Sequence, residues 1–161
     1  MPKNFRSGFI AGLIIAICLG VYLHQLWQPD RQIELHSADL IKAIEGSDWP
    51  EVEEKIAADY LDQWKHDRAE LVRRLREVMR YARNSHVVNA PPTVEADARS
   101  GTWKAKVTIE GEGEVNNLIK SRINSLPGPF ELRWRKVSGK PWDWQLTGVT
   151  NPDLSLEGTE F

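Results

Sequence analysis

The chain has 161 residues, of which 41% are hydrophobic and 27% are charged, and its formal net charge is −2 at pH 7. This balance is typical of one globular domain and excludes a disordered chain. The slight excess of acids is a poor match for nonspecific nucleic-acid binding, which needs many cations to neutralise phosphates.

An uncharged segment, GFIAGLIIAICLGVYLHQLW, runs from Gly8 to Trp27. About 20 residues of this kind suffice for a helix to cross the hydrocarbon of a bilayer. Lys3 and Arg6 precede the segment, so the positive-inside rule predicts a cytoplasmic N-terminus. We therefore expect residues 1–28 to form a cytoplasmic tip and a transmembrane signal anchor, with all later residues extracytoplasmic, which means periplasmic in a bacterium.

Two alternatives to an uncleaved anchor arise from the same segment. A cleaved signal peptide would be shorter and would end in a small-x-small site, which VYLHQLWQPD lacks. Lipidation of Cys18 would require a small residue where Ile17 stands. Cys18 is the only cysteine, which excludes an intrachain disulfide and a thiolate metal cluster. Gly8 and Gly12 have the small-xxx-small spacing of packed membrane helices, so a homodimer is possible.

Three helices are predicted at the start of the domain, residues 29–161. The first covers Gln32–Glu45. The second follows Asp48, a capping residue, and the four-residue recurrence of apolar side chains extends it to Trp64. The third follows Asp67, where the capping-box spacing repeats. The recurring residues of the second helix are Val52, Ile56, Tyr60 and Trp64.

After these helices the hydrophobic period changes from four residues to two. Alternation in TVEADA, TWKAKVTIE, FELRW and WDWQL predicts four strands with one buried face. SGKP predicts a turn between the last two strands, and helical spacing before PGP predicts a short helix between the second and third. The sequence therefore predicts an α+β fold, with helices packed on a curved antiparallel sheet of about four strands.

The stretch RWRKVSGKPWDWQL raises the question of whether its tryptophans bind a ligand or fill a core. Alternation places Trp134, Trp142 and Trp144 on the strand face opposite to the neighbouring cations. Aromatic side chains that stack on bases share a surface with cations. We therefore predict that these rings face the helices, together with Trp103.

Two phrases, AIEGSDWPEVEEKIAADYLDQW and FELRWRKVSGKPWDWQLTGVTNP, resemble the nuclear transport factor 2-like superfamily, also called the SnoaL-like or cystatin-like cone. The resemblance covers roughly residues 33–152. It implies a pocket between the concave sheet and the helices. Members include dehydratases, isomerases and protein-binding modules, so the fold does not give the function. The lining residues that the resemblance implies are Tyr60, Trp64, Trp103, Trp134 and Trp144.

An enzyme of the dehydratase or isomerase type would depend on Tyr60, assisted by His86 or Asp59. Tyrosine is a poor base at neutral pH because its unperturbed pKa is near 10. Asp62 and His66 have the spacing of an acid–imidazole pair, but they adjoin the polar run KHDR and are predicted to be a solvated surface pair. We assign no catalytic residue. No metal-ligand or cofactor motif is present, so no metal and no cofactor is expected.

Four arginines form a basic stripe on the third predicted helix. Arg73, Arg76, Arg80 and Arg83 fall within an arc of about 80° at 100° per residue. Three interpretations stay open. The stripe is a solvated face that acids such as Glu77 balance, or it is a surface that binds an acidic protein or anionic lipid. The third interpretation is a nucleic-acid site, although the predicted topology places the domain outside the cytoplasm, where it would not meet nucleic acid.

Taken together, these features favour a membrane-anchored, extracytoplasmic and noncatalytic α+β domain. Its work would be protein interaction or the binding of a small apolar molecule, and seven tryptophans predict a largely filled cone. The alternative is the dehydratase- or isomerase-type enzyme with a pocket around Tyr60.

Overall fold

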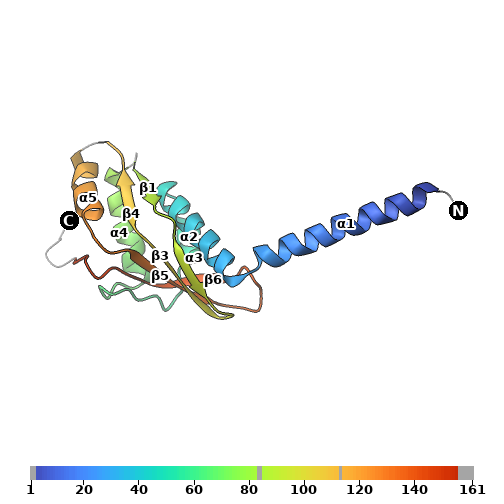
Figure 1. Ribbon diagram of the computed structural model, residues 1–161. Coiled ribbons are helices and arrows are strands. Elements are labelled where there is room, and N and C mark those ends of the chain that lie inside the picture. Colours follow the sequence, from blue (N-terminus) through green and yellow to red (C-terminus); the bar gives the residue numbers. More distant parts are fainter. Residues whose placement is uncertain (1–2, 83–84, 113, 156–161) are drawn as a thin grey trace.

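In the computed structural model, which describes residues 3–82, 85–112 and 114–155, a single long helix projects away from an α+β domain (Figure 1). The helices are α1 (Lys3–Leu26), α2 (Pro29–Glu45), α3 (Trp49–Lys55), α4 (Arg68–Tyr81) and α5 (Glu114–Asn124). The strands are β1 (His86–Asn89), β2 (Thr93–Ala96), β3 (Ser100–Ala105), β4 (Val107–Glu110), β5 (Phe130–Lys136) and β6 (Trp144–Thr150).

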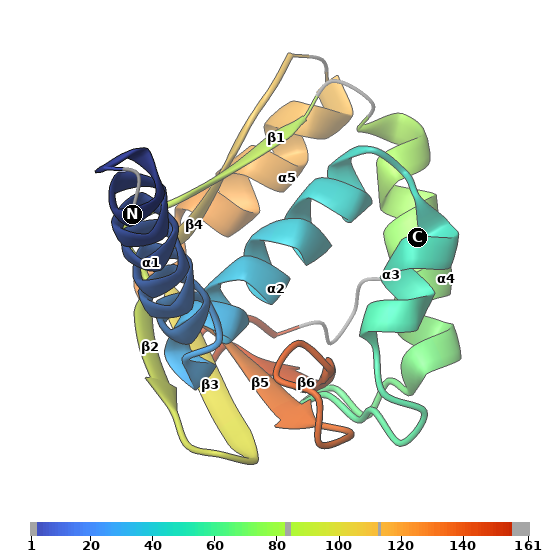
Figure 2. The same cartoon turned by 90° about the vertical axis from the view of Figure 1, so that its right-hand side faces the viewer.

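The main sheet has the order β2-β3-β5-β6, and all its neighbouring strands are antiparallel. The predicted fold class and the four-stranded sheet are therefore confirmed. Figure 2 shows α2 in the middle of the domain, with α3 and α4 on one side and β1, β2 and β4 on the other. The predicted short helix before PGP is also present, as α5.

A two-stranded ribbon of β1 and β4 extends this sheet and was not predicted as a separate unit. The single predicted strand TWKAKVTIE is divided at Lys106 into β3 and β4. Asn89 pairs with Val107 and Thr93 pairs with Lys104, so the β1–β2 side contains one extra residue. That side holds Pro91–Pro92, and proline has no N–H to donate to a ladder.

The prediction that the second helix extends to Trp64 is wrong, because α3 ends at Lys55. The following segment, 56–63, lies along the edge of β6 instead of continuing the helix. Its backbone N–H groups donate to carbonyl oxygens of β6. These bonds satisfy the hydrogen-bonding groups of both the segment and the edge strand. The bonds are Ala57 N to Leu146 O (2.9 Å), Leu61 N to Thr147 O (3.2 Å) and Gln63 N to Val149 O (3.3 Å).

Three of the sheet tryptophans fill the core, as predicted. Trp103, Trp134 and Trp144 are 2%, 1% and 3% exposed and pack with the apolar side chains of α2 and α3 in one cluster. Trp142 corrects the prediction, because 53% of it is exposed. The strand β6 begins only at Trp144, so Trp142 lies in the preceding turn, where the two-residue period does not apply.

Helix α1 projects away from the domain (Figure 1). Its large apolar side chains from Ile10 to Leu23 are exposed. Among the described residues, no single helix has both the length and the hydropathy of a membrane span. The two segments Gly12–Leu26 and Pro29–Glu45 reach that hydropathy together, but they are bent by 68° at the break between them.

Candidate functional site

Tyr60, the centre of the predicted pocket, is 2% exposed and belongs to the core. Its hydroxyl makes no hydrogen bond within the described residues. Burial raises the pKa of Tyr60 above its ordinary value of 10, and the nearby carboxylate of Asp62 raises it further. The phenol therefore stays protonated at neutral pH and is a poorer base than a free tyrosine.

The two assisting residues of the enzyme alternative have other partners. Asp59 forms a two-point ion pair with Arg135, at 2.7 and 2.9 Å, on the surface. Hydrogen bonds from Arg135 lower the pKa of Asp59, which makes it a weaker base. His86 lies on β1 with its side chain 77% exposed, 4.0 Å from Glu45. These three side chains are thus in three different environments.

Asp62 and His66 correct the prediction of a solvated helical pair. They lie in the irregular segment between α3 and α4, and the Asp62 side chain is only 1% exposed. One carboxylate oxygen accepts the backbone N–H groups of Trp64 (2.9 Å) and His66 (2.8 Å). The other accepts from Nδ1 of His66 at 3.0 Å. A buried carboxylate with three donors fixes the path of this turn.

Trp64 differs from the other predicted lining residues because it is only half-buried. Its indole N–H donates to the carbonyl oxygen of Leu154 at 2.9 Å, and its ring stacks on His66.

Two grooves of the domain have defined linings, and among the five predicted lining residues only Trp134 borders either of them. Within the described residues, no group of three or more His, Cys, Asp or Glu is placed to hold a metal ion.

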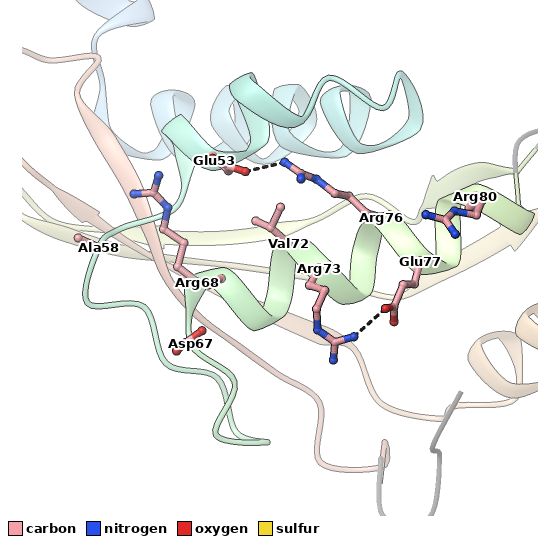
Figure 3. Close-up of a pocket in the computed structure, with 10 residues that line it drawn as sticks. Glu53, Ala58, Asp67, Arg68, Val72, Arg73, Arg76, Glu77 and Arg80 are labelled. Carbon is pink, nitrogen blue, oxygen red and sulfur yellow. Dashed lines mark hydrogen bonds and ion pairs between the residues drawn. The ribbon is translucent and has the colours of Figure 1, made fainter.

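The larger groove lies between α3 and α4 and has a volume of about 610 Å³ (Figure 3). It contains the described part of the predicted arginine stripe, whereas Arg83 lies outside the described residues. We call this surface the arginine groove. Its charged lining residues are Glu53 from α3, Asp67, Arg68, Arg73, Arg76, Glu77 and Arg80.

Acids neutralise the middle of the arginine groove. Arg73 bonds to Glu77 at 2.6 Å and to Glu70 at 2.7 Å. The guanidinium groups of Arg73 and Arg74 lower the pKa of Glu70 to about 2. Arg76 bonds to Glu53 at 2.7 Å and lies over the ring of Trp49, 5.6 Å from its centroid. The predicted balancing role of Glu77 is confirmed.

Arg68 and Arg80, at the two ends of the arginine groove, make no ion pair within the described residues. Figure 3 shows both guanidinium groups at opposite ends of α4. Sequence reasoning missed Arg68, although the four-residue series 68, 72, 76 and 80 points to it. Val72, the apolar member of that series, is buried at the floor of the groove.

No protein-family model matches the chain, and no curated protein matches it in sequence. Solved structures do match, at low identity. The CaMKII hub of S. rosetta has a TM-score of 0.58 and 12% identity, over 76% of this chain and 94% of the hub chain. An NTF2-like protein of Pseudomonas putida has a TM-score of 0.55 and 14% identity, over 74% and 82%.

A protein of unknown function with a cystatin-like fold, from Nostoc punctiforme, has a TM-score of 0.54 and 15% identity, over 78% of this chain and 92% of that one. Identities at this level establish the fold and not the activity. The topology and these matches agree that the domain following α1 has the nuclear transport factor 2-like, or cystatin-like, fold.

Proposed function

We propose that this chain is a single-pass membrane protein whose noncatalytic domain acts outside the cytoplasm as a protein-interaction module. Helix α1 supports the anchor. Its uncharged part, Gly8–Leu26, has 19 residues and rises about 28 Å, close to the roughly 30 Å of hydrocarbon in a bilayer. Ile10, Ile14 and Ile17 are each more than half exposed, and burying one such side chain in lipid gains about 1.5–3 kcal/mol.

The observation that carries the interaction role is the arginine groove. Arg68 and Arg80 have no ion-pair partner in the described part of the chain, and the side chain of Val72 forms an apolar floor between them. In the described part of the chain, the buried rings of Trp103, Trp134 and Trp144 fill the interior between the sheet and the helices. The ionisable groups of the enzyme alternative also face different surroundings. A surface role therefore fits the domain better than catalysis or the binding of a small apolar molecule in the cone.

The spacing of Arg68 and Arg80 suggests the chemistry of the partner. Arg68 and Arg80 are 80 − 68 = 12 residues apart on one helix, which is about 18 Å along its axis. An extended peptide covers that distance in about five or six residues. The partner that fits is an extended segment with acidic side chains separated by this interval.

A binding measurement with charge reversals tests this role. The probe is a fluorescent oligoglutamate peptide, with an oligoserine peptide for comparison, added to the full chain in detergent micelles. Arg68→Glu with Arg80→Glu is expected to weaken oligoglutamate binding about tenfold or more, since exposed ion pairs contribute roughly 0.2–1 kcal/mol each and the reversal adds repulsion. Fluorescence anisotropy measures the dissociation constant.

The matched control reverses two exposed cations outside the groove, Arg99→Glu and Lys106→Glu, neither of which makes an ion pair within the described residues. Its net charge is identical, so it reports long-range electrostatics alone. Equal weakening in both double variants, or no oligoglutamate binding by the unmodified chain, would exclude the arginine groove as the acidic-partner site.

A further inference from the structure

Two exposed tryptophans meet where α1 joins the domain. Trp27 follows the last residue of α1, and Trp142 belongs to the turn between β5 and β6. Their ring centroids are 6.4 Å apart, with the planes tilted by 49°. Trp27 is 44% exposed and Trp142 is 53% exposed, whereas the three tryptophans of the main sheet are buried. Figure 1 shows this turn at the end of the domain that faces α1.

The turn that carries Trp142 is held firmly to the domain. Nε2 of His36, on α2, donates a hydrogen bond to the carbonyl oxygen of Trp142 at 2.9 Å. Burial lowers the pKa of His36, so the imidazole is neutral at pH 7 and Nε2 carries its proton. The indole of Trp144 also donates to the carbonyl oxygen of Pro141, at 2.8 Å. Trp142 is therefore presented outward by a preformed turn.

From this placement we infer that Trp27 and Trp142 together form an aromatic contact with the headgroup region of the bilayer, which seats the domain on the membrane surface. The inference rests on the proposed anchor. If α1 lies in the membrane, Trp27 lies at its outer interface, and Trp142 is held beside it. Indole rings favour that interface because they combine a large apolar surface with one polar N–H.

The charges around the turn are compatible with phospholipid headgroups. Lys140 is exposed next to Trp142, and Lys136 lies near the ring of Trp144, with its Nζ 5.9 Å from the centroid. Asp30 and Asp143 lie at the same junction, so the surface has no strong excess of either sign. The contact is thus expected to depend on the aromatic rings more than on anionic lipid. Because the turn is already ordered, little conformational entropy is lost when it touches the bilayer.

Fluorescence quenching by lipid tests the contact in the full chain. Three single-cysteine proteins carry a polarity-sensitive dye: one on native Cys18, and two on Ser138→Cys or Tyr81→Cys in a Cys18→Ser background. Ser138 is exposed in the same turn as Trp142, whereas Tyr81 is exposed at the end of α4. Each is reconstituted in two kinds of phosphatidylcholine vesicle. Acyl chains brominated near the headgroup report on positions 138 and 81, and acyl chains brominated near their ends report on Cys18, at the middle of the proposed anchor. Quenching at position 138 is expected to be several-fold stronger than at position 81.

Two further variants assign the effect to the ring. Trp142→Gln is expected to reduce quenching at position 138 to the level at position 81, and Trp142→Tyr is expected to retain it, because tyrosine is also an interfacial residue. Strong quenching at Cys18 with equal, weak quenching at 138 and 81 would overturn the seating inference and leave the anchor standing. Weak quenching at Cys18 would overturn the anchor and the inference with it.

Discussion

Replacement of Trp144 by alanine is expected to lower the free energy of unfolding by about 3–5 kcal/mol, the range typical of large-to-alanine changes in cores. The ring is 3% exposed and packs in the same cluster as Trp103 and Trp134. The change also removes the indole donor that bonds to the Pro141 carbonyl at 2.8 Å. Urea denaturation of the full chain in detergent, followed by circular dichroism, measures this loss.

Trp142→Ala is the matched control for that experiment. It removes the same side chain two residues earlier, at a position that is 53% exposed. The hydrogen bond from His36 ends on the backbone of residue 142, so the change leaves it in place. We expect a loss within about 0.5 kcal/mol, as for ordinary surface substitutions. Similar losses for both variants would show that the two rings do not differ in burial as described.

Asp62→Ala is expected to destabilise the domain by about 3 kcal/mol, because it leaves several buried donors without their acceptor. The backbone N–H groups of Trp64 and His66 and the imidazole of His66 all donate to this carboxylate. The turn that they hold leads into α4 and therefore positions Arg68 at the end of the arginine groove. Thermal unfolding and the affinity for oligoglutamate both report the change.

Asp62→Asn is the informative comparison, because its amide oxygen can still accept both backbone N–H groups. We expect it to retain most of the stability lost in Asp62→Ala. If alanine and asparagine behave like the unmodified chain, the buried network does not support this turn, and the placement of Asp62 is wrong.

The sequence predicted the features that depend on neighbouring residues. Asp48 and Asp67 cap their helices as expected, accepting N–H groups from Glu51 at 3.3 Å and Glu70 at 2.9 Å. The two-residue period located the main strands because each has one buried and one wet face. The arginine stripe followed from helical spacing alone, since a regular helix fixes which side chains share a face.

Features that depend on distant residues were not predictable from local patterns. The apolar recurrence through Tyr60 and Trp64 is compatible with a helix, but the open edge of β6 offers the backbone other partners, and α3 stops at Lys55. In the sequence, Asp62 has the polar neighbours of a surface residue. Its side chain is buried because the segment that carries it lies along the edge of β6. Arg76 forms an ion pair with Glu53 and lies over the ring of Trp49, and both partners belong to α3. The spacing of residues along α4 could not predict these contacts.

The side of the membrane on which the domain lies is the central claim of this account, and one labelling measurement tests it directly. Tyr81 is 66% exposed, so a cysteine there, in a Cys18→Ser background, is open to a membrane-impermeant maleimide. We predict equal labelling in intact cells and after lysis, with none in the cysteine-free chain. Labelling only after lysis would place the domain in the cytoplasm and contradict the account.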